Sequence, residues 1–120
     1  MSKILIVDDE PDLLDFFCDE LEDIGFDVQP ASSGDEGLQA IAQTAFSVVL
    51  SDMRMPGMNG IEFLTAVKAR TPDTVRIMLT GNADLETAIQ AMNQGNVFRF
   101  LTKPCPVDDL VNALSRIVLP

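Results

Sequence analysis

The sequence predicts an α/β fold in which a parallel sheet is covered by helices on both faces. Apolar, strand-sized runs alternate with helix-like stretches five times along the 120 residues, which is typical of successive βα units. Three of the runs, at residues 4–7, 48–50 and 77–79, are unbroken, as expected for strands buried on both faces. The length suits a single domain with one core.

The pattern within each run predicts the order of the strands. The second run alternates apolar with polar residues and ends in Pro30, and the fifth run contains Arg99. Interrupted patterns of this kind are typical of edge strands. We therefore expect the order 2-1-3-4-5, a flavodoxin-like doubly wound (βα)5 sheet. The expected strands lie near residues 3–7, 26–30, 46–51, 75–80 and 97–101.

Local signals mark the ends of the first two helices. Pro11 suits a first helical turn, and Gly25 suits the residue after a helix. Ser33 and Glu36 have the spacing of a capping box, in which each side chain bonds the other residue's backbone N–H. The expected helices lie near residues 11–24, 34–44, 60–70, 84–93 and 107–118.

The later helices have similar boundaries. Asn59 and Glu62 resemble a second capping box, and the pair Thr71-Pro72 ends the third helix because proline disfavours helical geometry in the residue before it. Gly95 follows the fourth helix, whose many polar residues make it the weakest helix signal of the five.

Composition excludes several classes of site. The chain has no histidine, which removes Ser-His-Asp triads, Cys-His dyads and histidine-ligated zinc. The net charge of −11 argues against direct contact with nucleic acid or a membrane. Cys18 and Cys105 lack metal or redox spacing, so we interpret them as reduced thiols. The chain shows no signal peptide and no membrane-length apolar run, so we expect a cytoplasmic location.

Acidic residues follow two of the buried runs. Asp8 and Asp9 end the first strand and Asp52 ends the third, and in the expected order these strands are neighbours at the switch point where such sheets bind ligands. Two carboxylates about 4 Å apart repel by roughly 4 kcal/mol at an effective dielectric near 20. A divalent cation would offset that repulsion, and hard oxygen ligands favour Mg²⁺, with Mn²⁺ as the alternative ion.

Groups suited to an anion follow the other two strands at this edge. Thr80 and Gly81 end the fourth strand, and Lys103 with Pro104 follows the fifth. A carboxylate nucleophile, a divalent cation, an ammonium and a hydroxyl are the parts of a phosphoryl-transfer site, which depends on positioning and charge more than on acid–base chemistry. A phosphohistidine donor would have to belong to another molecule, because this chain has no histidine.

Four segments together resemble the receiver domain of two-component response regulators, the chemotaxis receiver type included. The resemblance covers essentially the whole chain, residues 1–120, as a single receiver domain that stands alone or is cut from a longer regulator or hybrid kinase. The segments are ILIVDDE (4–10), VVLSDMRMPGMNG (48–60), LTG (79–81) and FLTKP (100–104).

The resemblance implies a role for each acid. Asp52 would be the phosphoacceptor. Asp9 and Asp52 would bind Mg²⁺ directly, Asp8 would bind it through water, and the backbone carbonyl of Arg54 would complete the protein ligands. The Arg54 side chain would overhang the phosphoryl site.

The resemblance also assigns the groups that bind the phosphoryl oxygens. Lys103 would pair with them, Thr80 would move to donate its hydroxyl, and the Gly81 N–H would support them. Phe100 would be the switch aromatic that follows Thr80, although tyrosine is commoner there, and Gly81 stands where alanine is common. The peptide bond before Pro104 would be cis.

The expected function is a phosphorylation-dependent signalling switch rather than an enzyme, limited to self-directed phosphotransfer and autodephosphorylation. Its partners would be a sensor histidine kinase or phosphotransfer protein and an output domain or effector. The fourth helix, fifth strand and fifth helix would form the responsive surface, and a homodimer could use it too.

Two other functions stay open at this stage. An Mg²⁺-dependent phosphatase with an aspartate nucleophile shares the carboxylate and the metal, but such enzymes usually carry an acid where this chain has Arg54. A flavodoxin-like cofactor binder would meet repulsion between its phosphate and the acids Asp8 and Asp9, and the chain has no Trp or Tyr to stack a flavin.

Overall fold

In a computed structural model, which describes residues 2–118, the five predicted strands form one parallel sheet in the order β2-β1-β3-β4-β5. This order confirms the prediction, with the second and fifth strands at the edges. Ile4 on the central β1 lies opposite Val28 on one side and Val48 on the other. The strands are β1 (Lys3–Val7), β2 (Asp27–Ala31), β3 (Val48–Asp52), β4 (Val75–Thr80) and β5 (Arg99–Thr102).

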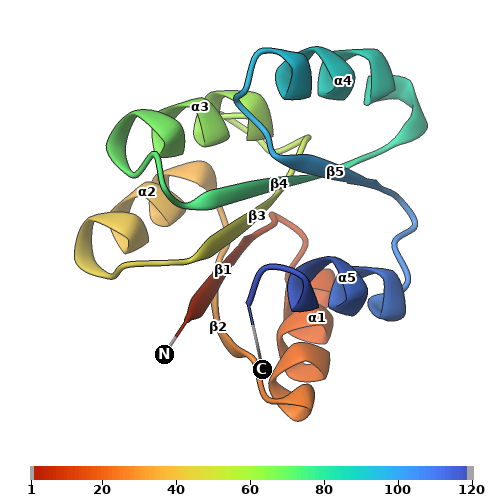
Figure 1. Cartoon of the computed structure of the whole chain (residues 1–120). Coiled ribbons are helices and arrows are strands. Elements are labelled where there is room, and N and C mark those ends of the chain that lie inside the picture. Colours follow the sequence, from red (N-terminus) through yellow and green to blue (C-terminus); the bar gives the residue numbers. More distant parts are fainter. Residues whose placement is uncertain (1, 119–120) are drawn as a thin grey trace.

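The five predicted helices are all present and lie on both faces of the sheet. Helices α2, α3 and α4 cover one face, and α1 and α5 cover the other (Figure 1). None of the helices within residues 2–118 is long and apolar enough to cross a membrane. They are α1 (Pro11–Ile24), α2 (Gly34–Gln43), α3 (Gly60–Arg70), α4 (Leu85–Asn93) and α5 (Val107–Ser115), and a short 3₁₀ helix, η1 (Asn82–Asp84), precedes α4.

Alternate residues of the central strands supply two hydrophobic cores. On β1, Leu5 and Val7 pack under α2, α3 and α4, whereas Ile4 and Ile6 pack against α1 and α5. Successive strand residues point to opposite faces, so an unbroken apolar run is needed when both faces are covered. The double-sided burial predicted from these runs is therefore confirmed.

The helix ends differ from the predictions in two details. Ser33 caps α2 by accepting the Glu36 N–H at 3.1 Å, but the Glu36 carboxylate bonds Ser32 rather than Ser33, so the predicted capping box is incomplete. Helix α5 ends at Ser115, short of residue 118, because the Ile117 N–H bonds the Leu114 carbonyl in a tighter turn.

Other predicted boundaries are confirmed. The capping box of Asn59 and Glu62 makes both of its bonds, at 2.9 and 3.1 Å. Gly25 ends α1 with a φ of 114°, a left-handed conformation that glycine adopts without steric cost.

Backbone hydrogen bonds tie together the loops at the carboxyl edge of the sheet. The Met53 N–H bonds the Leu79 carbonyl at 2.9 Å, and the Lys103 N–H bonds the Thr80 carbonyl at 2.8 Å. These bonds hold the loops that follow β3 and β5 against the end of β4, so the residues just beyond the strands share one small region.

Candidate functional site

The three acids predicted from the sequence converge at the carboxyl edge of the sheet. Asp8, Asp9 and Asp52 each offer a carboxylate oxygen, and these oxygens lie within 4.8 Å of one another. Asp8 is 2% exposed and Asp52 is 3% exposed, whereas Asp9 is open to solvent. Two ionisable carboxyl groups are thus buried beside a third, an arrangement that is costly without a compensating positive charge.

Asp8 shows this cost directly. Its pKa is raised to about 6, because burial and the neighbouring carboxylate of Asp52 raise it by more than the hydrogen bond from the Glu10 backbone N–H lowers it. The Glu10 N–H donates to Asp8 Oδ1 at 2.9 Å and fixes the orientation of the carboxyl group. Asp8 therefore holds its proton more tightly than an exposed aspartate does.

Lys103 supplies the positive charge nearest to Asp52. Its Nζ lies 2.7 Å from Asp52 Oδ1, and Lys103 reaches this place from a loop in which the bond to Pro104 is cis. Burial lowers the pKa of Lys103, but the carboxylates of Asp52, Asp8 and Glu10, with Asp52 foremost, together more than reverse this effect, so the pKa lies above its ordinary value. Asp52 Oδ1 is buried and accepts no well-directed hydrogen bond among residues 2–118, so the Lys103 ammonium is its one counter-charge at ion-pair distance there.

The hydroxyl side of the site lies at the end of β4. Thr80 is fully buried, and its hydroxyl donates to the Gly81 carbonyl at 3.2 Å. The same carbonyl accepts the Asp84 N–H at 3.1 Å, which links the end of β4 to η1. The Thr80 hydroxyl is therefore held by a single bond to the loop that leads into α4.

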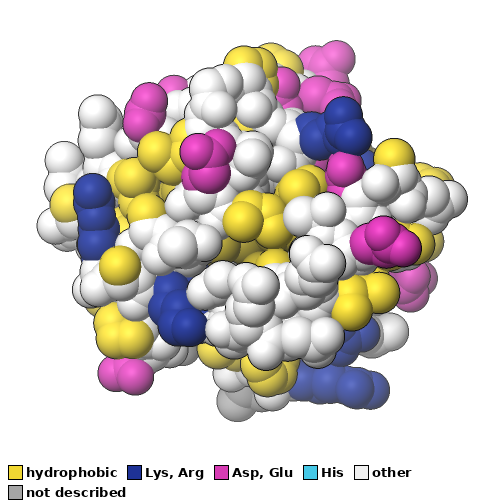
Figure 2. Space-filling model, turned by 90° about the horizontal axis from the view of Figure 1, so that it is seen from above, with side chains coloured by type: hydrophobic (Ala, Val, Ile, Leu, Met, Phe, Trp, Pro, Cys, Tyr) yellow, Lys and Arg dark blue, Asp and Glu magenta, His cyan; other side chains and the backbone are white. Residues whose placement is uncertain are grey.

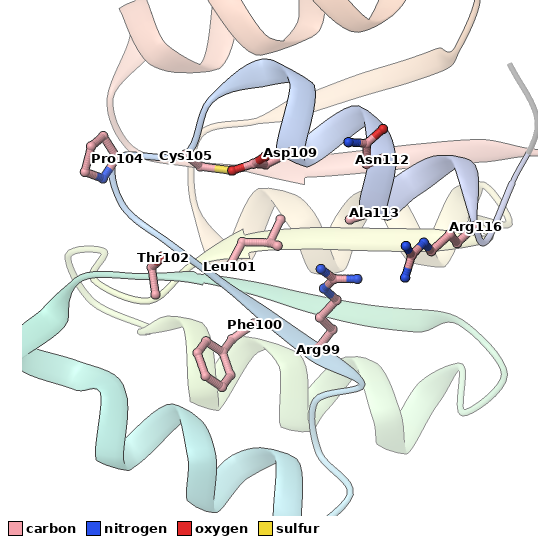
Figure 3. Close-up of a pocket in the computed structure, with 10 residues that line it drawn as sticks. All are labelled: Arg99, Phe100, Leu101, Thr102, Pro104, Cys105, Asp109, Asn112, Ala113 and Arg116. Atoms are coloured by element: carbon pink, nitrogen blue, oxygen red, sulfur yellow. The ribbon is translucent and has the colours of Figure 1, made fainter.

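Phe100 lies apart from the acids, on β5. Figure 3 shows a groove between β5 and α5, about 440 Å³ in volume, into which Arg99 and Leu101 point. The Phe100 ring points to the opposite side of the strand, where it packs, partly exposed, against the core under α2, α3 and α4. The Phe100 ring therefore lies on the face of the sheet that α4 covers, and not on the face that α5 covers.

Arg54 takes a position that the sequence did not reveal. Its guanidinium forms a two-pronged ion pair with Asp84, with Nε to Oδ2 at 2.7 Å and Nη2 to Oδ1 at 2.9 Å. From the sequence we expected the Arg54 side chain to overhang the phosphoryl site, and Asp84 was not among the expected site residues. The pairing depends on how two loops 30 residues apart fold together, and no local pattern encodes it.

Gly60 is a further site residue that the sequence analysis missed. A Cβ atom on Gly60 would lie 2.3 Å from the Asp52 carbonyl oxygen and 2.9 Å from Met53 Cα. The first residue of α3 therefore packs directly on the backbone of the central acid. In the sequence, the one signal for this role was that Gly60 begins a predicted helix eight residues after Asp52.

The geometry fits a divalent cation. Carboxylate oxygens from Asp8, Asp9 and Asp52 converge here, and such oxygens are the hard ligands that Mg²⁺ prefers. The buried Asp52 Oδ1 accepts no well-directed hydrogen bond and has only the Lys103 ammonium at ion-pair distance, so it retains lone-pair capacity for a cation. The residues present are therefore suited to an Mg²⁺ ion.

Comparison with known protein families identifies the class of protein to which the chain belongs. Residues 4–115 match the family model described as the response regulator receiver domain. The chain therefore belongs to the response regulator receiver domain family, whose members act as signalling switches in two-component systems and bind Mg²⁺ in an acidic pocket.

Individual relatives agree with this assignment. The hydrogenase transcriptional regulatory protein HoxA of Cupriavidus necator is 36% identical over 117 residues, which cover 98% of this chain and 24% of HoxA. A solved structure described as adenylate cyclase from Rhodopirellula baltica is 44% identical with a TM-score of 0.93, covering 96% of this chain and 85% of that one. The chemotaxis protein CheY4 of Vibrio cholerae is 32% identical with a TM-score of 0.88, covering 98% and 99%.

The chain spans about a quarter of the length of the curated relatives that it matches first. Response regulators are phosphorylated by histidine kinases and regulate output domains. Membership of this family thus accounts for a switch built around the acidic pocket.

Proposed function

We propose that this chain is a phosphorylation-dependent switch in which Asp52 accepts a phosphoryl group from the phosphohistidine of a partner kinase or phosphotransfer protein. The observation that carries the proposal is the setting of Asp52, which is buried beside two other acids with Lys103 2.7 Å from its Oδ1. A carboxylate without a well-directed hydrogen bond, flanked by a cation, is available as a nucleophile.

In the transfer, a carboxylate oxygen of Asp52 forms a bond to phosphorus while the bond from phosphorus to the partner's imidazole nitrogen breaks. The electron pair of that bond leaves with the nitrogen. Lys103 balances the charge on the phosphoryl oxygens, and the Gly81 N–H donates to them. Mg²⁺, held by Asp8, Asp9, Asp52 and the Arg54 carbonyl, would supply further neutralisation of that charge.

The acyl phosphate then acts on the rest of the domain through Thr80 and Phe100. The Thr80 hydroxyl exchanges its bond with the Gly81 carbonyl for one with a phosphoryl oxygen, and Phe100 follows it toward the space that Thr80 leaves. The surface of α4, β5 and α5 changes in consequence and controls an output domain, an effector or a second copy of the chain.

Exposed apolar side chains on that surface support its role as a contact site. Ile89 and Met92 on α4 are 46% and 37% exposed, and Phe98 just before β5 is 62% exposed. Figure 2 looks down on the side of α4 and shows hydrophobic side chains among scattered charged ones. Such residues fit a surface that is covered in one state of a switch.

The test is Mg²⁺-dependent labelling of Asp52. We expect acetyl phosphate to phosphorylate the wild-type domain once, at a base-labile position, and to leave Asp52→Asn unlabelled. Asp12→Asn, which removes an acid in the first turn of α1, is the control and should label fully. Equal labelling of Asp52→Asn and wild type would rule out the assignment.

A further inference from the structure

The ion pair between Arg54 and Asp84 joins the loop that carries the acidic site to the segment that begins α4. Arg54 lies two residues after Asp52, and Asp84 is the last residue of η1. Both oxygens of the Asp84 carboxylate accept from the guanidinium, at 2.7 and 2.9 Å. Two parallel N–H···O bonds give an arginine–carboxylate pair more energy and more geometric specificity than one bond does.

The two partners differ in their freedom to move. The Asp84 side chain is 14% exposed, and its backbone N–H is bonded to the Gly81 carbonyl. The Arg54 side chain is 74% exposed and makes no other side-chain hydrogen bond among residues 2–118. Asp84 is therefore the fixed partner, and the Arg54 side chain can turn away from it at little steric cost.

Asp84 also lies within electrostatic reach of the phosphoryl site. The Arg54 guanidinium lowers the pKa of Asp84, and the Lys103 ammonium lowers it further. A phosphoryl group on Asp52 would add about −1.5 to −2 charges near Lys103. This group would attract the mobile guanidinium more strongly than a single carboxylate does, because it carries more charge and three acceptor oxygens.

We propose that Asp84 is a positioning residue that holds the Arg54 guanidinium aside in the unphosphorylated domain, and that a phosphoryl group on Asp52 competes with Asp84 for it. When Arg54 transfers, η1 and the first turn of α4 lose a tether to the loop after β3. This is a second link from the site to α4, separate from Thr80 and Phe100. The inference rests on the function proposed above.

The test measures the affinity for beryllofluoride with Mg²⁺, a stable mimic of the phosphoryl group, by isothermal titration calorimetry. Asp84→Asn frees Arg54, so we expect affinity to rise about threefold, the fold-change typical of one exposed ion pair. Glu86→Gln is the matched control, because it removes one negative charge from the first turn of α4 without touching Arg54. It should change affinity by less than half as much.

A double-mutant cycle separates competition for Arg54 from simple charge repulsion. Arg54→Gln should lower the affinity for beryllofluoride, and in that background Asp84→Asn should raise it no more than Glu86→Gln does. If Asp84→Asn raises affinity equally with and without Arg54, the carboxylate acts only by repulsion and the proposal is wrong. If Asp84→Asn changes the affinity of the otherwise wild-type domain no more than Glu86→Gln does, the proposal is also wrong.

Amide hydrogen exchange gives a second measurement that a general change in charge would not mimic. In the unphosphorylated domain, Asp84→Asn and Arg54→Gln should each speed exchange at residues 84–86 by a similar factor, and Glu86→Gln should not. Failure of the wild-type domain to bind beryllofluoride at all would instead count against Asp52 as the phosphoacceptor. The two failures are thus distinguishable.

Discussion

The Lys103 ammonium lies 2.7 Å from Asp52 Oδ1 and is the nearest counter-charge to a pocket that contains three carboxyl groups. The ammonium is partly open to solvent, whereas the carboxylate is almost completely buried. Removing the lysine would therefore leave a buried acid without its partner, and the stability of the domain should depend on which cation is present.

We expect Lys103→Met to lower the free energy of unfolding of the metal-free domain by about 1–2 kcal/mol, less than for a fully buried pair because solvent screens the exposed lysine. Added Mg²⁺ should restore more stability to this variant than to wild type, because the ion replaces the missing charge. Urea unfolding with EDTA and with Mg²⁺ measures both effects. Lys68→Met, on α3, is the control, and an equal response to Mg²⁺ in the two variants would contradict the prediction.

Asp8 should make the stability of the metal-free domain depend on pH. Burial raises the pKa of Asp8 from 3.8 to about 6, so the folded state binds this proton more tightly than the unfolded state does. Stability should therefore increase as the pH falls from about 7 toward 4, by on the order of 2 kcal/mol. Acids whose pKa is lowered by folding, such as Asp84, act in the opposite direction, mainly as the pH falls below about 5.

Thermal melting between pH 7 and pH 5 with EDTA checks this prediction. Asp8→Asn should melt higher than wild type at pH 7 and lose most of the slope between the two pH values. Saturating Mg²⁺ should oppose the slope as well, because the ion favours ionised acids around it. A wild-type melting temperature that falls between pH 7 and pH 5 with EDTA would show that Asp8 does not carry this shift.

Gly60 and Gly81 should respond to alanine in opposite ways. An added Cβ at Gly60 would collide with the Asp52 carbonyl oxygen, so we expect Gly60→Ala to cost about 1–3 kcal/mol and to weaken beryllofluoride binding by moving Asp52. At Gly81 no atom lies within 4 Å of the added Cβ and φ is −83°. Gly81→Ala should therefore stabilise the domain by about 0.4–1 kcal/mol. Equal melting temperatures for the two variants would contradict this contrast.

The sequence predicted what depends on periodicity and on strand ends. The unbroken run from Ile4 to Val7 indicated a strand covered on both faces, and the sheet order followed from the contrast with interrupted runs. Because parallel strands end at the same edge, the order alone brought Asp8 and Asp52 together. The meeting of the acids was therefore predictable from residue pattern and topology.

What the sequence did not predict depends on contacts between loops. The partner of Arg54 is set by the path of the chain from β4 into η1, and any of the many acids could have paired with it. The role of Gly60 depends on how closely α3 approaches β3. The Glu36 carboxylate bonds Ser32 rather than Ser33 because of the path that the chain takes into α2. Such choices follow from tertiary packing, which local patterns do not record.

Arg76 is another residue that only the structure explains. It lies on β4, is 9% exposed, and donates to the backbone carbonyls of Pro72, Thr74, Gly95 and Asn96 at 2.8–3.3 Å. Among residues 2–118 it has no acidic partner within ion-pair distance. It therefore fastens the turn after α4 to the loop before β4 at the edge of the sheet opposite the acids.

We expect Arg76→Lys to lower the free energy of unfolding by about 2 kcal/mol, because an ammonium cannot reach carbonyls on both loops and leaves some of them unpaired. Amide exchange at residues 95–98 should accelerate, whereas Mg²⁺ affinity at the distant edge should stay within twofold of wild type. Arg99→Lys, on β5, is the matched control. A comparable loss of stability in that control would show that the effect comes from arginine content rather than from this set of contacts.

The last prediction separates phosphoryl binding from its transmission. Thr80→Val removes the hydroxyl at a fully buried position, so the fold should lose about 1 kcal/mol and beryllofluoride affinity should fall about tenfold, while Mg²⁺ affinity stays unchanged. Phe100→Leu leaves every proposed phosphoryl ligand in place, so it should keep beryllofluoride affinity within about threefold. Both variants should lose most of the beryllofluoride-induced chemical-shift change in α4 and β5. If Phe100→Leu retains the wild-type shifts in α4, then Phe100 is core packing alone and the signal reaches α4 by another route, of which the Arg54–Asp84 pair is the first to examine.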